Sequence, residues 1–132
     1  MQKMFSVEQI KQAHSKVKSG ADFPVYIKDI KRLGVTFYKT YVIDGHTVYF
    51  GDGDYKASSP AKYGNLTIAE ICDAETFGKD LSIHQQGKTD YPAFCKDCAK
   101  SGIENWTVCL TNMTCTYYDK AGNKILVEQI PN

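Results

Sequence analysis

The sequence has no run of about 18 apolar residues, which is the length that a membrane-spanning helix needs. Residues 1–9 contain no apolar core of the kind that a secretory signal carries, so we expect no signal peptide. Sixteen basic and fifteen acidic residues leave a formal net charge of +1. No excess of positive charge therefore favours a polyanion or an anionic lipid surface. We expect neither a nucleic-acid partner nor a membrane association.

Cysteine is present in an odd number, five, in a chain without an export signal. This combination favours free thiols in a reducing compartment over a disulfide framework, and we predict a cytoplasmic protein. The 132 residues include 42% hydrophobic and 23% charged residues, which is ordinary for a globular protein. We expect one domain that spans residues 1–132.

A segment that begins at Asp22 recurs 68 residues later, because residues 22–30 (DFPVYIKDI) resemble residues 90–98 (DYPAFCKDC). The same offset, without a gap, pairs further glycine, β-branched and aromatic residues: Gly34 with Gly102, Val35 with Ile103, Tyr38 with Trp106, Tyr49 with Tyr117 and Phe50 with Tyr118. Internal repeats decide how a fold is assembled. The offset predicts a structural duplication with halves at about residues 6–57 and 73–130.

Capping residues and apolar periodicity predict four helices. The first spans residues 7–18, begins with a capping box of Ser6 and Gln9, and ends at Gly20. The second spans residues 23–33 after Asp22. The third and fourth follow the caps Asp73 and Asp90, the third over residues 74–86 and the fourth as far as residue 102.

Each helix pair is followed by segments rich in β-branched and aromatic residues, which are separated by turn residues. These segments predict six strands: residues 35–43, 46–50, 54–57, 103–110, 113–119 and 124–130. Each half therefore has the order helix-helix-strand-strand-strand. We predict an α+β fold with a mostly antiparallel sheet and with helices packed on one of its faces.

The motif Cys95-Lys96-Asp97-Cys98 has the spacing of a redox pair or of half a zinc site. The predicted helix places Cys95 about one turn inside its start, whereas a redox pair needs the helix terminus. A zinc site would need a second close pair, but Cys109 and Cys115 are six residues apart on two strands. We predict no metal site and no cofactor.

The repeat gives a third interpretation of this motif, since Cys95 and Cys98 align with Ile27 and Ile30 on the buried stripe of the equivalent helix. A free cysteine packs like a small hydrophobic residue, and we predict that both thiols lie in the core. The alternative hypothesis is a small thiol or histidine enzyme. It keeps Cys95, Cys98 and His84 as candidate catalytic residues.

Aromatic residues concentrate on the predicted strands. Four of them are candidate binding residues: Tyr38, Tyr49, Trp106 and Tyr117. Such rings offer a large contact area with a polar tip, so a face of the sheet or a cleft between the halves would bind an unknown protein or a small ligand. The alternative is that the rings only complete the packing of the sheet. We expect a monomer or a homodimer.

Three strings of the sequence, residues 14–24, 44–51 and 84–92, resemble a family of short bacterial and prophage proteins of unknown function. Members are sometimes labelled "phage envelope protein". The resemblance implies a small single-domain protein of prophage origin and transfers no catalytic residue. The leading functional hypothesis is a non-catalytic cytoplasmic binding or accessory module, with the thiol enzyme and a phage structural component as alternatives.

Overall fold

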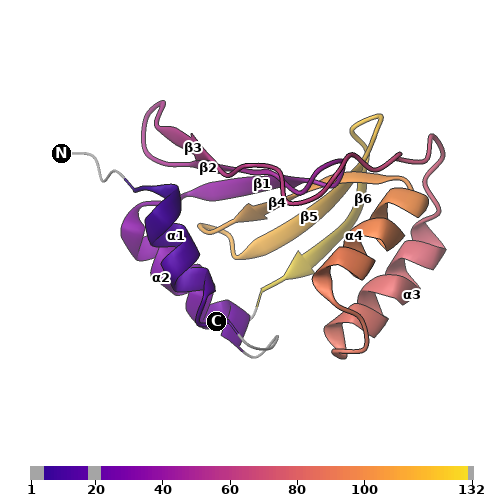
Figure 1. Cartoon of the computed structure of the whole chain (residues 1–132), viewed down its shortest axis with the longest axis horizontal. Coiled ribbons are helices and arrows are strands. Elements are labelled where there is room, and N and C mark those ends of the chain that lie inside the picture. Colours follow the sequence, from indigo (N-terminus) through magenta and orange to yellow (C-terminus); the bar gives the residue numbers. More distant parts are fainter. Residues whose placement is uncertain (1–4, 18–21, 131–132) are drawn as a thin grey trace.

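The computed structural model describes residues 5–17 and 22–130. The helices are α1 (Val7–His14), α2 (Phe23–Leu33), α3 (Ala74–Gln85) and α4 (Tyr91–Lys100) (Figure 1). The strands are β1 (Phe37–Tyr41), β2 (Thr47–Phe50), β3 (Lys56–Ser58), β4 (Ile103–Cys109), β5 (Thr114–Asp119) and β6 (Lys124–Gln129). The element order helix-helix-strand-strand-strand therefore occurs twice.

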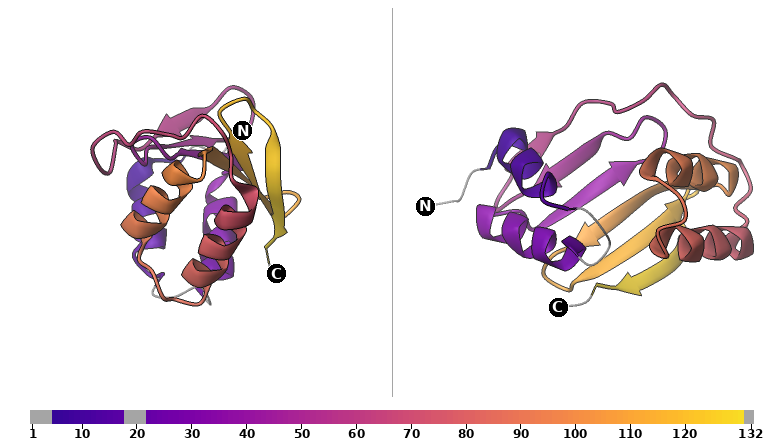
Figure 2. Two further views of the ribbon diagram at one scale, coloured as in Figure 1. Left: turned by 90° about the vertical axis from the view of Figure 1, so that its right-hand side faces the viewer. Right: turned by 60° about the horizontal axis from the view of Figure 1, so that its bottom comes forward.

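The six strands form a single sheet in the order β3-β2-β1-β4-β5-β6, and every neighbouring pair is antiparallel. All four helices lie on one side of this sheet (Figure 2). The pair α1 and α2 lies near one end of the strands, and the pair α3 and α4 lies near the other (Figure 1). The predicted α+β fold, with helices on one face of an antiparallel sheet, is confirmed.

Strand register in one half recurs in the other half at the 68-residue offset. The four pairs of β1 with β2 are Phe37–Phe50, Tyr38–Tyr49, Lys39–Val48 and Thr40–Thr47. Their counterparts between β4 and β5 are Asn105–Tyr118, Trp106–Tyr117, Thr107–Thr116 and Val108–Cys115. The halves join through β1 and β4, and the central pair of that ladder is Lys39–Thr107, which is also related by the offset. A duplication would produce this register, and the duplication itself stays a prediction.

The first helix begins as predicted but ends earlier. Ser6 and Gln9 form a capping box: the Gln9 N–H donates to Ser6 Oγ at 3.2 Å, and the Ser6 N–H donates to Gln9 Oε1 at 2.9 Å. The prediction of helix as far as residue 18 is wrong, because α1 ends at His14. The Ser15 hydroxyl donates to the Gln12 carbonyl at 2.6 Å and so competes with the helical pattern. The predicted terminator Gly20 lies outside the described residues.

Two of the three predicted aspartate caps are confirmed. The Asp73 carboxylate accepts from the N–H of Thr76 at 3.0 Å, and the Asp90 carboxylate accepts from the N–H of Ala93 at 2.9 Å. The prediction for Asp22 is wrong, because its side chain makes no capping hydrogen bond. Its backbone is helical (φ −87°, ψ −12°), whereas a capping side chain requires an extended residue.

The helices attach to the sheet through small and aliphatic side chains. Ile27 and Ile30 of α2 are completely buried, and Cys95 and Cys98 occupy the corresponding positions of α4 with 1% and 0% exposure. The prediction that both thiols lie in the core is therefore confirmed.

Candidate functional site

The four aromatic residues singled out from the sequence share one face of the sheet. Tyr38, Tyr49, Trp106 and Tyr117 come from the four central strands β1, β2, β4 and β5, and all are buried on the helix-facing side. Successive side chains of a strand point to opposite faces of the sheet, and the strand register places these four on the same face. The ring centroids of the cross-strand pairs are 5.5 Å apart for Tyr38 and Tyr49 and 6.0 Å apart for Trp106 and Tyr117.

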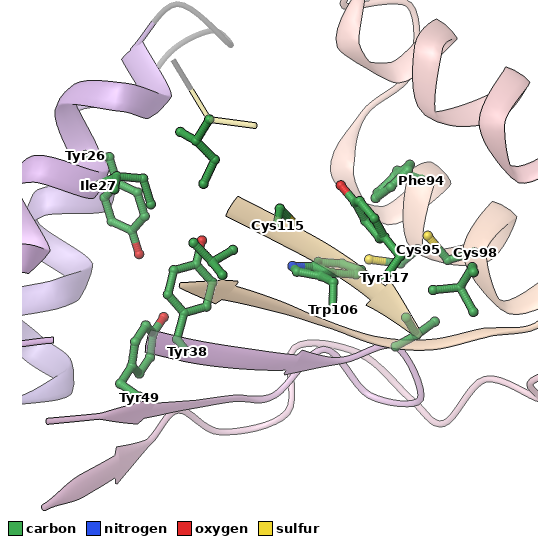
Figure 3. Close-up of a cluster of buried hydrophobic side chains, with 14 of the residues drawn as sticks. Tyr26, Ile27, Tyr38, Tyr49, Phe94, Cys95, Cys98, Trp106, Cys115 and Tyr117 are labelled. Atoms are coloured by element: carbon green, nitrogen blue, oxygen red, sulfur yellow. The ribbon is translucent and has the colours of Figure 1, made fainter. Parts of the chain in front are cut away.

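The helix pairs add one ring each to this group. Tyr26 of α2 shares a hydrogen bond with Tyr49, and Phe94 of α4 lies 5.8 Å from Trp106 between ring centroids. Tyr26 and Phe94 are themselves related by the 68-residue offset. We call the six residues Tyr26, Tyr38, Tyr49, Phe94, Trp106 and Tyr117 the aromatic seam, and Figure 3 shows them between the two helix pairs.

The aromatic seam is buried less completely than the aliphatic residues beside it. Its six members keep between 4% and 8% of their surface in contact with solvent. Ile27, Ile30, Val42 and Ile103 around it keep none. Solvent therefore still reaches a small part of these rings.

Two polar atoms of the seam have no hydrogen-bond partner among residues 5–17 and 22–130. They are the hydroxyl of Tyr38 and the indole Nε1–H of Trp106, and these two side chains make ring and charge contacts only. In the same residues, the one side-chain polar atom that is both occluded and unpartnered is Asn105 Oδ1. The two seam atoms are therefore not occluded. The Tyr38 hydroxyl points away from the strands, and the Trp106 indole nitrogen points toward the side of the first helix pair (Figure 3).

A third polar atom of the seam is already engaged. The Tyr117 hydroxyl donates to Glu128 Oε1 at 3.0 Å, and Gln85 Nε2 donates to Glu128 Oε2 at 2.7 Å. Burial raises the pKa of Tyr26, Tyr38 and Tyr117 above its ordinary value, so all three hydroxyls keep their protons at neutral pH. Among them, the Tyr38 hydroxyl is the donor that remains available to another molecule.

The thiols of the Cys95–Cys98 motif are poorly placed for nucleophilic chemistry. Both are buried, and burial raises the pKa of each above its ordinary value. The nearby Tyr63 and Tyr91 hydroxyls and the charge of Lys62 lower the pKa of Cys95, which only partly offsets this effect. Because the thiolate is the reactive species, a protonated and buried thiol is inert.

His84 is held at the end of α3 rather than directed at a thiol. Its Nδ1 lies 3.0 Å from the carbonyl oxygen of Thr89, and its ring stacks on Phe94 with the centroids 4.4 Å apart. The described part of the chain contains no group of three or more side chains suited to a metal ion. The structure thus places His84 beside the aromatic seam, where its ring contacts Phe94 rather than either cysteine of the motif.

The face of the sheet that carries no helix has aromatic residues of its own. Phe37 stacks on Phe50 with the centroids 4.3 Å apart, and Tyr41 stacks on His46 at 4.5 Å. Phe37 is 37% exposed, and Val127 on β6 is 57% exposed. This open face is distinct from the aromatic seam, because none of the four candidate binding residues lies on it.

Sequence reasoning missed several residues around the seam. Tyr26 and Phe94 could have been found, since the offset pairs them and the helical stripe contains both. Glu128 and Gln85 could not have been found from the sequence, because they come together only where the edge strand β6 passes the end of α3. Tyr91 was identified only as part of a helix start, yet its ring packs edge-on against Trp106 at 6.4 Å.

No helix in the described ranges is long and apolar enough to cross a membrane. The chain belongs to the family described as "Protein of unknown function (DUF1398)", whose model matches residues 11–129. Comparison with curated proteins gives no match. The family description assigns no activity, so a functional conclusion depends on the aromatic seam itself.

Proposed function

We propose that the protein is a non-catalytic binding module that takes a small, planar and largely apolar molecule into the aromatic seam. The observation that carries this proposal is the pair of unpartnered polar atoms at Tyr38 and Trp106. Both residues are more than nine-tenths buried, and they come from equivalent strands of the two halves. A ligand with hydrogen-bond acceptors would supply the partners that these atoms lack.

Hydrogen bonding favours a ligand at these two atoms. Each bond that a ligand acceptor makes to a donor without a protein partner contributes about 0.5–1.5 kcal/mol net, and a phenylalanine in the same place could not form it. The indole N–H can only donate, so its partner must be an acceptor such as a carbonyl or carboxylate oxygen. The surrounding rings offer stacking and edge contacts to a flat molecule.

Binding without covalent chemistry fits the surroundings of the seam. The buried thiols nearby keep their protons, and the Nδ1 atom of His84 is engaged by Thr89. The alternatives made from the sequence, a phage structural component and a protein-binding sheet face, stay predictions. Size-exclusion chromatography tests the first, because a structural component should assemble into large particles.

The experiment uses benzamide, which combines a flat ring with a carbonyl acceptor. Trp106 is the single tryptophan of the chain, so its indole N–H gives one resonance in a ¹⁵N-labelled sample. We expect benzamide to move this resonance with a Kd on the order of 1 mM, as a ligand of nine heavy atoms allows. We also expect it to raise the melting temperature.

Two variants complete this experiment. Tyr38→Phe should weaken benzamide binding, because it removes the free hydroxyl and keeps the ring. Phe37→Leu, on the opposite face of the sheet, should leave binding unchanged. The proposal is wrong if neither benzamide nor its charged analogues benzoate and benzamidinium change the Trp106 resonance or the melting temperature.

A further inference from the structure

Basic side chains gather beside the aromatic seam. The Lys62 ammonium lies 5.5 Å from the centroid of the Tyr91 ring, and that ring packs edge-on against Trp106. The His14 ring likewise packs edge-on against Tyr26, with the centroids 5.2 Å apart. Lys62 and His14 thus each reach the seam through one aromatic residue, from the long loop after β3 and from α1.

The charges of this group are not neutralised within the protein. Burial lowers the pKa of Lys62, and the charge of Lys11 on α1 lowers it further. Burial also lowers the pKa of His14, with Lys62 as the second cause. In the described ranges, none of Lys11, His14 and Lys62 forms an ion pair with a carboxylate. Lys11 and Lys62 repel one another and leave a positive potential beside the seam, whereas the lowered pKa of His14 keeps its ring mostly neutral at pH 7.

The one carboxylate that touches the seam does not reverse this balance. Glu128 lies on the edge strand β6, and each of its oxygens already accepts one hydrogen bond, from Tyr117 and from Gln85. The unpartnered Nε1–H of Trp106 requires an acceptor and would repel a cation. The free hydroxyl of Tyr38 is likewise able to donate to an acceptor.

We propose, on the basis of the proposed function, that the ligand of the aromatic seam is a planar organic anion of the aromatic carboxylate class. Its ring lies against the seam. Its carboxylate accepts hydrogen bonds from the seam donors and is attracted by Lys11 and Lys62.

Benzoate, benzamide and benzamidinium test the charge of the ligand, because they have nearly the same shape and carry charges of −1, 0 and +1 at pH 7. Their Kd values are measured through the Trp106 indole resonance at low salt. We expect benzoate to bind about five- to tenfold more tightly than benzamide, which is the effect of one charge near cations in a partly solvated site. Benzamidinium should bind more weakly than benzamide.

A lysine variant assigns this preference to the basic group. Lys62→Met keeps most of the apolar stem and removes the charge, so it should reduce the ratio of the benzamide Kd to the benzoate Kd. Lys79→Met is the control, since Lys79 is exposed on α3 and pairs with Glu75. Added salt should weaken the binding of benzoate and not that of benzamide.

The outcomes separate this inference from the proposed function. Benzamide or benzamidinium binding as tightly as benzoate would overturn the inference about charge and would still support a ligand in the seam. A benzoate preference that survives in Lys62→Met would also overturn it. If none of the three compounds binds, the proposed function itself fails.

Discussion

Two regions of the core bring helices and sheet together in different ways. Within each half, aliphatic residues or thiols of one helix are buried to 0–1% exposure, at Ile27 and Ile30 in one half and at Cys95 and Cys98 in the other. Between the halves, large rings meet with residual solvent contact and with two unpartnered polar atoms. The first region has the features of packing for stability, and the second has the features of a site that accepts another molecule.

The strongest test of this contrast is Ile30→Ala. Ile30 is completely buried, so removing three carbons leaves a cavity under α2. We expect the free energy of unfolding to fall by about 2–5 kcal/mol. Urea denaturation followed by circular dichroism measures this loss. A loss below about 1 kcal/mol would show that the contact between α2 and the sheet is not tightly packed.

Alkaline pH should lower the free energy of unfolding, because the core contains buried thiols. Burial raises the pKa of Cys98, and it raises the pKa of Cys115 to about 12, against an ordinary value of 9.0. A raised pKa means that these thiols stabilise the fold fully below pH 9, and that this stability is lost as the pH rises towards the folded pKa. The expected loss is about 1.4 kcal/mol for each thiol per pH unit above 9.

Urea denaturation at pH 8, 9 and 10 measures this dependence on pH. The variant Cys98→Ala removes one of the two thiols and should flatten the decline, although it starts from a lower stability. A free energy of unfolding that stays constant between pH 8 and pH 10 would contradict the burial of these thiols.

Within the seam, the Tyr117→Phe variant should have the next largest effect. It removes the hydroxyl that donates to Glu128 at 3.0 Å and leaves the carboxylate with one donor fewer. Hydrogen bonds to charged groups contribute about 1.5–3 kcal/mol, and we expect a loss of that order in the free energy of unfolding. A change within experimental error would mean that Glu128 finds another partner.

Tyr38→Phe is the matched change with the smallest expected effect. Its hydroxyl has no partner in the described part of the chain, so its removal breaks no hydrogen bond. We expect the free energy of unfolding to change by less than about 0.5 kcal/mol, because no buried group loses a partner. Equal losses for Tyr38→Phe and Tyr117→Phe would erase the distinction between an engaged and a free hydroxyl.

Most of the fold follows from local signals in the sequence. Asp73 and Asp90 mark helix starts, and Gly34 and Gly102 adopt positive φ angles of 114° and 83° after the two helices they follow. Such residues act through their own backbone neighbourhood, so a single sequence reveals them. Asp22 failed as a cap because its backbone is helical, which its residue type cannot show.

Only part of the candidate site could be predicted from the sequence. Tyr38 and Trp106 could be selected from their strands and from the offset, because alternation and repetition are sequence patterns. Lys62 could not be selected in this way, because its position depends on the path of the loop after β3. That path is fixed by distant contacts, such as the hydrogen bond from the Lys62 N–H to the Asp44 carbonyl at 2.8 Å.

The central claim is that the polar atoms of the seam are buried and yet free, and hydrogen exchange of the Trp106 indole tests it most directly. The single indole N–H of the ¹⁵N-labelled protein is followed after transfer to D₂O. We predict that it exchanges much faster than the backbone amides of β4 and β5, and that benzoate slows it. Protection as strong as that of those amides would contradict the account, because it would show that the indole is sealed in the core.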